Sequence, residues 1–218
     1  MPGDLDLPLV DRTAAGRALG ALVAAMHLPD PLVLALPRGG VPVGLEVARA
    51  LKAPLDLLLV RKIGVPFQRE LAVAAVLEGA EPVIVVDEPI RAEAGVPQSY
   101  IDEQTRIELA EIGRRRRAYL GDRLPLPITA RTVIVVDDGI ATGTTARAAI
   151  KGLRRRDPAR IVLAVPVAPR DTAARLRVEV DDLVCLAQPD LFGAIGLFYV
   201  DFHQLSDEEV VQALQYAP

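Results

Sequence analysis

Two adjacent carboxylates, Asp137 and Asp138, stand directly before a loop made mostly of glycine and threonine. That loop contains Gly139, Ala141, Thr142, Gly143, Thr144 and Thr145. Unpaired backbone N–H groups in such a loop, at the start of a helix, form a pocket that favours an anion such as phosphate. Ionised carboxylates only accept hydrogen bonds, so they suit two neighbouring hydroxyls on the same ligand. The stretch therefore predicts a site for a ribose phosphate.

A second glycine loop follows the apolar run 32–36 and carries Arg38, Gly39 and Gly40. Glycine lets the backbone approach a ligand closely, and arginine adds a charge with several donors in a planar fork. On these residues alone, a ligand-binding loop and a plain turn are equally good interpretations.

Arg61 and Lys62 follow another apolar run, 55–60. Doubly wound sheets bind ligands at the carboxyl ends of their strands, which is where these two cations are expected. A solvated strand end is the alternative. The next segment, 62–70, is expected to be a loop, in which Glu70 acts as a carboxylate base or merely caps the segment that follows.

Strand patterns and helix patterns alternate along the chain, which is typical of a parallel sheet with right-handed crossovers. We expect strands over 32–36, 55–60, 133–136, 160–167 and 182–187, and a hairpin over 71–77 and 82–87. Helices are expected over 12–27, 42–51, 97–120, 144–156 and 171–177, with a closing helix after Ser206. The predicted fold is α/β: a doubly wound, mostly parallel sheet flanked by helices over residues 1–187, with a small C-terminal hood over 188–218.

The predicted hood is rich in aromatic residues, although only 4% of the chain is aromatic. The residues expected to contact a planar ligand there are Phe192, Phe198, Tyr199 and Asp201. Aromatic clustering near a predicted site favours a surface on which a planar base stacks. A small satellite core is the equally good alternative.

The composition is that of a globular protein, with 51% hydrophobic and 25% charged residues. A formal net charge of −4 argues against a protein whose main ligand is a nucleic-acid backbone. The basic run 114–117 is interpreted as a solvated helix face, with a nucleic-acid surface as the alternative. Cys185 is the single cysteine, which excludes a disulfide framework and suits the cytoplasm. No stretch approaches the ~20 apolar residues of a membrane span.

The run from Val133 to Thr145, Val-Ile-Val-Val-Asp-Asp-Gly-Ile-Ala-Thr-Gly-Thr-Thr, resembles the phosphoribosyl-pyrophosphate (PRPP) binding motif of the type I phosphoribosyltransferases. The resemblance implies that Asp137 and Asp138 hold the 2′ and 3′ hydroxyls of the ribose, while residues 141–145 wrap the 5′-phosphate. It also implies Mg²⁺ as cofactor, held by the two aspartates indirectly, through ribose hydroxyls or water.

Other stretches occur in the order found in that family. The Leu-Pro-Arg-Gly-Gly stretch resembles its pyrophosphate loop, where related enzymes often have a cis peptide bond, which we expect between Pro37 and Arg38. Arg61 and Lys62 resemble the pair that opens a mobile catalytic loop, here 62–70, close to the pyrophosphate. More closely, the chain is similar to small bacterial predicted phosphoribosyltransferases, which share the Leu-Pro-Arg-Gly-Gly, Val-Arg-Lys-Ile-Gly and Asp-Phe-His-Gln stretches.

For that group the resemblance implies a reaction class without a named acceptor. The expected reaction transfers the 5-phosphoribosyl group of PRPP to a small nitrogenous base and releases pyrophosphate, with Arg38, Arg61 and Lys62 near the leaving group. The resemblance also allows a homodimer. A regulatory protein of the same fold, which senses PRPP or a nucleotide and acts on RNA or a partner protein, is the alternative.

One residue departs from the pattern of the 6-oxopurine enzymes. The residue before Thr-Gly is usually an aspartate there, whereas Ala141 stands in this chain, which argues against a direct hypoxanthine or guanine assignment. Adenine enzymes can also carry alanine, so a purine acceptor stays open. Proton transfer would then fall to Glu70 or another residue of its loop.

Overall fold

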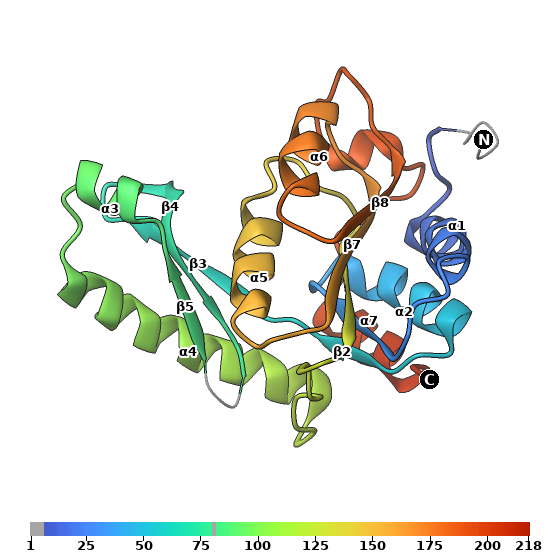
Figure 1. Cartoon of the computed structure of the whole chain (residues 1–218), viewed down its shortest axis with the longest axis horizontal. Helices are drawn as coiled ribbons and strands as arrows, with labels where there is room; N and C mark the ends of the chain where they lie inside the picture. The colour runs from blue at the N-terminus through green and yellow to red at the C-terminus, as the bar shows by residue number, and fades with distance from the viewer. Residues whose placement is uncertain (1–6, 80–81) are drawn as a thin grey trace.

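The computed structural model describes residues 7–79 and 82–218 (Figure 1). Its centre is a five-stranded parallel sheet with the strand order β2-β1-β6-β7-β8. The strands are β1 (Pro31–Ala35), β2 (Leu55–Leu57), β6 (Thr132–Val136), β7 (Arg160–Val167) and β8 (Asp182–Ala187). Every residue of β6 is buried, as expected for an apolar strand that is covered on both faces. The expected parallel sheet flanked by helices is confirmed.

Helices cover both faces of this sheet. One face packs against α1 (Arg12–Ala24), α2 (Gly40–Leu51) and α7 (Asp207–Gln215), the other against α5 (Thr144–Arg154) and α6 (Arg170–Arg177). Because strand side chains alternate, Val33 and Ile134 enter the first core while Leu34 and Val135 enter the second. All strands of the sheet run the same way, so the carboxyl ends of β1, β2 and β6 lie at one edge.

The long helix expected over 97–120 is α4 (Gln98–Leu120). Its buried residues include Ile101, Ile112 and Tyr119, which join the core of the first face. None of the helices in the described part of the chain is both long and apolar enough to cross a membrane.

A second, antiparallel sheet corrects two expectations. It contains β3 (Val60–Val65), β4 (Gln68–Leu77) and β5 (Val83–Val86), in that order, and is followed by α3 (Glu88–Glu93). The strand expected over 55–60 is only the short β2, because the chain leaves the central sheet before Val60. The loop expected over 62–70 is a β hairpin whose turn is formed by Pro66 and Phe67.

The hairpin strands approach each other closely near Gly64. A Cβ at this position would collide with the backbone of Arg69, and the strand register shifts on both sides of Gly64. Phe67 at the tip is fully exposed. Closure of this hairpin over the site stays a prediction.

A buried ion network joins the two sheets to α4. Arg116 donates from Nη1 to Glu78 Oε2 at 3.0 Å and from Nη2 to Asp56 Oδ1 at 3.2 Å. All three side chains are at most 12% exposed. The basic run 114–117 is therefore not a uniformly solvated face, because its third member is a buried structural residue.

The C-terminal hood is built together with the start of the chain. Leu9 donates from its backbone N–H to Phe198 O at 2.8 Å and accepts from Val200 N–H at 2.8 Å. The short 3-10 helix η1 (Ile195–Phe198) lies in this segment. The helix expected after Ser206 is α7, which packs on the first face of the central sheet and begins with a capping box formed by Ser206 and Glu209. At the start of α1 the side chain of Asp11 forms the N-cap, because it accepts from Ala14 N–H at 2.6 Å.

Candidate active site

The acid pair lies at the carboxyl end of β6. Asp137 Oδ1 accepts a hydrogen bond from the backbone N–H of Asp138 at 2.9 Å. Asp138 is buried, and its Oδ2 accepts from Arg12 Nε at 2.8 Å. The two carboxylates therefore meet different surroundings: an arginine holds Asp138, whereas Asp137 has no cationic partner among the described residues.

Burial dominates the electrostatics of this pair. It raises the pKa of Asp137 well above the ordinary value, and the negative charge of Asp138 raises it further. Burial also raises the pKa of Asp138, although Arg12 works against that shift. A partly buried and a buried carboxylate with raised pKa values are stabilised in their ionised forms by any ligand that brings hydroxyl donors or a cation. Oxygen donors of this kind suit Mg²⁺, which is commonly held by one or two carboxylates together with substrate oxygens.

Asp137→Asn is expected to stabilise the ligand-free protein at neutral pH. A carboxyl group whose pKa is raised on folding loses its proton less readily in the folded state, so its ionisation lowers stability above the folded pKa. This penalty vanishes as pH falls below the ordinary value of 3.8, where both states are protonated. Thermal unfolding of the two proteins should show a gain at pH 7, about 2–4 °C per kcal/mol, that shrinks toward acid pH.

Asp122→Asn is the matched control for that measurement, because Asp122 is an exposed aspartate in the turn after α4. Its unfolding temperature should follow that of the unchanged protein at each pH. If Asp137→Asn lowered the unfolding temperature at pH 7, ionised Asp137 would not destabilise the ligand-free protein, and the explanation from its raised pKa would be wrong.

The loop after β1 presses against the acid pair. The peptide bond between Pro37 and Arg38 is cis, as predicted. A Cβ at Gly40 would lie 2.6 Å from the carbonyl oxygen of Val136, and one at Gly39 would overlap the carboxylate of Asp138. Only glycine permits this approach, so both glycines are required by the packing of the loop against the end of β6. Ligand binding by this loop stays a prediction.

Two clefts open beside this loop. The first has a volume of about 190 Å³ and is lined by Pro37, Arg61, Arg115, Asp137 and Thr145. It brings together residues from β3, α4 and α5 and from the loops that follow β1 and β6. Arg61 is held by Glu108, with Nε to Oε2 at 2.6 Å, and Arg115 by Glu111, with Nε to Oε1 at 2.7 Å. The first cleft is thus lined by two arginines, each held by a glutamate, and by the carboxylate of Asp137.

The second cleft has a volume of about 300 Å³ and lies at the hood. Its lining includes Arg12, Arg38, Gly39, Asp138 and Phe202. The guanidinium of Arg38 is 3.7 Å from Asp207 Oδ1 at the start of α7. Each of the two clefts therefore reaches one member of the acid pair.

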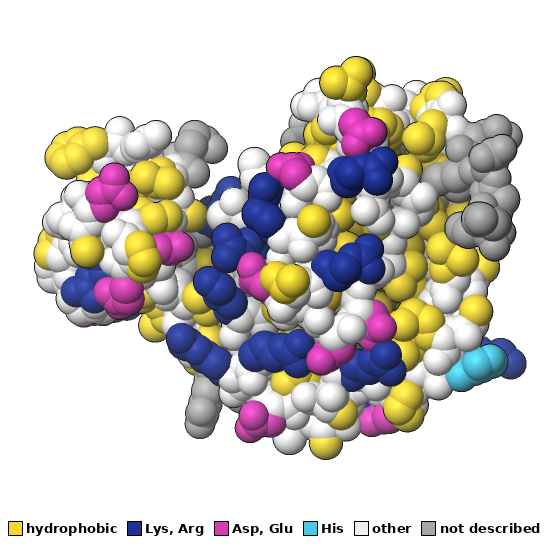
Figure 2. Space-filling model, turned by 45° about the horizontal axis from the view of Figure 1, so that its top comes forward, with side chains coloured by type: hydrophobic (Ala, Val, Ile, Leu, Met, Phe, Trp, Pro, Cys, Tyr) yellow, Lys and Arg dark blue, Asp and Glu magenta, His cyan; other side chains and the backbone are white. Residues whose placement is uncertain are grey.

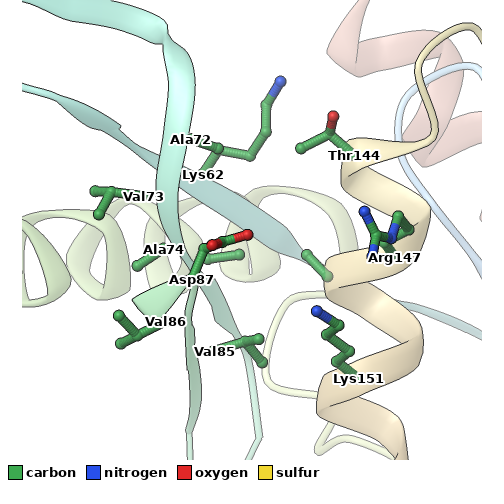
Figure 3. Close-up of a pocket in the computed structure, with 12 residues that line it drawn as sticks. Lys62, Ala72, Val73, Ala74, Val85, Val86, Asp87, Thr144, Arg147 and Lys151 are labelled. Atoms are coloured by element: carbon green, nitrogen blue, oxygen red, sulfur yellow. The ribbon is translucent and has the colours of Figure 1, made fainter. Parts of the chain in front are cut away.

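Lys62 does not share the first cleft with Arg61. Both residues lie within β3, where consecutive side chains point to opposite faces. Lys62 instead lines a third pocket, between the second sheet and α5 (Figure 3). The two cations expected to act together are thus separated, because the predicted loop is a strand. Glu70 lies in β4, and its side chain is outside the described part of the structure.

The loop from Gly139 to Thr145 leads into α5. Gly143 has a φ of +79° and precedes the first turn, which has no side-chain cap. Thr142 Oγ1 and Thr144 Oγ1 are 3.2 Å apart. The carbonyl of Ala141 accepts from Thr172 Oγ1 at 3.0 Å, which fixes the loop from its far side. The expected arrangement of a loop with uncapped helix N–H groups is present.

The hood aromatics pack on one another. Phe192 and Phe198 stack with ring centres 5.2 Å apart, and Tyr199 and Phe202 do so at 5.0 Å. Tyr199 is buried and donates from its hydroxyl to the carbonyl oxygen of Asp138 at 2.6 Å. These contacts form a satellite core, so Tyr199 supports the acid pair. Asp201 Oδ1 is 2.9 Å from His203 Nδ1. Base contacts by Phe192, Phe198, Tyr199 and Asp201 stay predictions.

Sequence reasoning missed two arginines at the site, Arg12 and Arg115. Arg12 also donates from Nη1 to the carbonyl oxygen of His203 at 2.9 Å, and its guanidinium lies 3.9 Å from the ring centre of Phe202. A signal for Arg12 existed, because a cation in the first turn of a helix opposes the helix dipole and needs another reason to be there. Arg115 stands in a run of four arginines, and nothing in the run distinguishes it.

Comparison with known proteins gives a consistent result. The family model described as "Phosphoribosyl transferase domain" matches residues 13–203. Two Mycobacterium tuberculosis proteins, each named "Putative phosphoribosyl transferase", are 45% identical over 207 residues, which is 95% of this chain and 46% of theirs. The chain therefore spans about half the length of these relatives. The crystal structure of TT1426 from Thermus thermophilus is 38% identical with a TM-score of 0.86, over 97% of this chain and 100% of that one.

Proposed function

The chain belongs to the phosphoribosyl transferase domain family, and on this premise we propose that it transfers the 5-phosphoribosyl group of PRPP to a nitrogenous base and releases pyrophosphate. One observation carries the proposal. Pro37 of the cis loop, Asp137 of the acid pair and the start of α5 border the same cleft. A ribose with phosphates at both ends needs these three elements around it.

The acid pair positions the ribose in this proposal. Asp137 and Asp138 accept hydrogen bonds from the 2′ and 3′ hydroxyls, and Arg12 fixes the orientation of Asp138. The 5′-phosphate is bound by the N–H groups of residues 141–145. Holding both ends of the sugar orients C1 for attack, and orientation alone can lower a barrier by several kcal/mol.

Cations around the two clefts stabilise the leaving group. As the bond from C1 to the pyrophosphate oxygen breaks, C1 gains positive character and the pyrophosphate gains negative charge. The bond from C1 to the base nitrogen forms as that nitrogen loses its proton to Glu70, another residue of the hairpin or water. In this proposal Arg61 and Arg115, from the first cleft, and Arg38, from the second, stabilise the anion. Asp137 and Asp138 would hold Mg²⁺ indirectly, and the ion would supply further positive charge near the leaving group.

The alternative, a regulatory protein that acts on RNA through residues 114–117, loses support from the side-chain contacts. Arg116 is buried in the ion network, and Arg114 and Arg115 both donate to Glu111. Four arginines in a row therefore do not present four charges to one backbone. The chemistry of transfer has the better structural basis.

Calorimetry with PRPP and Mg²⁺ tests the proposal at the binding step. We expect one PRPP per chain and an affinity that falls sharply when Mg²⁺ is removed with a chelator. Ribose 5-phosphate, which lacks the pyrophosphate, should bind more weakly than PRPP. The absence of PRPP binding in the presence of Mg²⁺ would refute the assignment.

Arg115→Met is expected to weaken PRPP binding about tenfold, which equals about 1.4 kcal/mol and is near the lower end for a hydrogen bond between charged groups. Arg114→Met is the matched control. Both arginines donate to Glu111, but only Arg115 lines the first cleft. Calorimetry should therefore separate these neighbours, and equal affinities for the two variants would remove Arg115 from the site.

A further inference from the structure

The third pocket holds cations that the proposed reaction does not use. It lies between the second sheet and α5 and has a cavity volume of about 70 Å³ (Figure 3). Lys62 comes from β3, and Arg147 and Lys151 come from successive turns of α5. Asp87 closes the pocket at the end of β5. Neither Asp137 nor Asp138 lines it.

Charge in this pocket is unbalanced. Among the described residues, Arg147 pairs with Glu179, Nε to Oε1 at 2.6 Å, while Lys62 and Lys151 form no ion pair. Figure 3 shows Lys151 pointing from α5 into the gap, Asp87 facing it from the end of β5, and Lys62 pointing away from Lys151 toward Thr144. Lys and Arg side chains also gather on the molecular surface over α5 (Figure 2). Among the described residues the lining thus includes two lysines without an ion pair and one carboxylate.

We propose that the third pocket is a second ligand site, for a small phosphorylated compound that also carries hydroxyl groups. Cations from two elements can surround a phosphate group. Asp87 only accepts hydrogen bonds, so it repels a bare phosphate and favours a ligand with donors beside the phosphate. Alanines and valines of the second sheet, among them Ala72, Ala74 and Val85, give the pocket an apolar side. The cavity exceeds several-fold the ~10–15 Å³ that a single water needs, which leaves room for a phosphate group.

Binding there would connect two parts of the fold. The ligand would bridge Lys62 on the second sheet to Lys151 on α5, whose first residue, Thr144, lines the pocket and belongs to the predicted 5′-phosphate loop. A ligand that draws the sheet toward α5 changes the setting of this loop, and the coupling is reciprocal. The inference does not depend on transferase activity, because it concerns residues outside the first two clefts.

The test is a titration of the full chain, labelled with ¹⁵N, with glycerol 3-phosphate, followed by backbone amide shifts in NMR. We expect shifts at Lys62, Arg147 and Lys151 that saturate together. Lys151→Glu should lower the affinity measured from these shifts at least tenfold, and Lys151→Gln should lower it less. Lys52→Glu, an exposed lysine after α2, is the matched control and should leave the affinity unchanged.

Asp87→Asn is expected to raise the affinity of the third pocket for phosphate, whereas Lys151→Glu lowers it. Removing its charge should tighten the binding of inorganic phosphate, while asparagine can still cap α3, where Asp87 accepts from Ile90 N–H at 3.2 Å. Shifts confined to residues 139–145, or an affinity that is the same in Lys151→Glu and the unchanged protein, would overturn the second site. Either result would leave PRPP binding in the first cleft unaffected, so the two proposals fail separately.

Discussion

Replacing Asp137 and Asp138 together by asparagine is expected to weaken PRPP binding by about 10²- to 10⁴-fold. Hydrogen bonds to a charged group contribute about 1.5–3 kcal/mol each, and the variant removes the charge from two such acceptors. Asparagine keeps the shape of each side chain, and Arg12 keeps its bond to the carbonyl oxygen of His203. A loss of PRPP affinity would therefore reflect weaker binding of the ribose rather than unfolding of the segment around His203.

Calorimetry with Mg²⁺ and PRPP measures this loss, and Asp122→Asn serves as the control for removing an exposed carboxylate. Thermal unfolding of the double variant checks that it is folded. Affinity within about threefold of the unchanged protein would exclude the acid pair from ribose binding.

The largest expected effect on stability comes from Arg116→Met. This change leaves Asp56 and Glu78 buried without their cation, and breaking a buried ion pair on one side costs about 3–5 kcal/mol. Arg114→Met removes an exposed pair with Glu111 and should cost less than about 1 kcal/mol. Unfolding by urea, with both variants at neutral pH, measures the difference.

The effect of Arg116→Met should depend on pH. Burial raises the pKa of Glu78, and Arg116 is the main group that opposes this shift. Without Arg116 the folded pKa rises further, so ionised Glu78 destabilises the variant above that pKa and the destabilisation fades as pH falls. A loss below about 1 kcal/mol at neutral pH, or one that grows toward acid pH, would contradict the buried network.

Uniform apolar runs between clear boundaries could be predicted from the sequence. The bounds expected for 160–167 and 182–187 match those of β7 and β8. Both strands are covered by helices, so nearly every residue is apolar and the turns at each end are distinct. The loop at Pro37 and the acid pair were also found, because a parallel sheet brings the carboxyl ends of its strands to one edge.

The run from Leu55 onward shows where such reasoning fails. Its apolar residues continue past the point at which the chain leaves the central sheet, and hydrophobicity does not distinguish one long strand from β2 followed by β3. This wrong assignment of secondary structure also made part of the predicted site wrong. In a loop Arg61 and Lys62 could meet one ligand, whereas in β3 they point to opposite faces.

Contacts between residues that are far apart in the sequence could not be predicted either. Arg12 and Asp138 are 126 positions apart, and their bond depends on how α1 packs beside the end of β6. Likewise, Arg116 lies on the helix face that carries the buried Ile112 and Tyr119, but its bonds to Asp56 and Glu78 depend on how α4 packs beside the two sheets. Local patterns do not contain such packing, since it follows from the assembled fold.

Transfer itself is tested most directly by a pyrophosphate-release assay with PRPP, Mg²⁺ and a panel of purines, pyrimidines and other nitrogenous bases. The account predicts release that requires one of the bases, requires Mg²⁺, and is lost in the variant with asparagine at Asp137 and Asp138. No release with any base, while calorimetry shows clear PRPP binding, would contradict the transferase and favour a protein that senses PRPP.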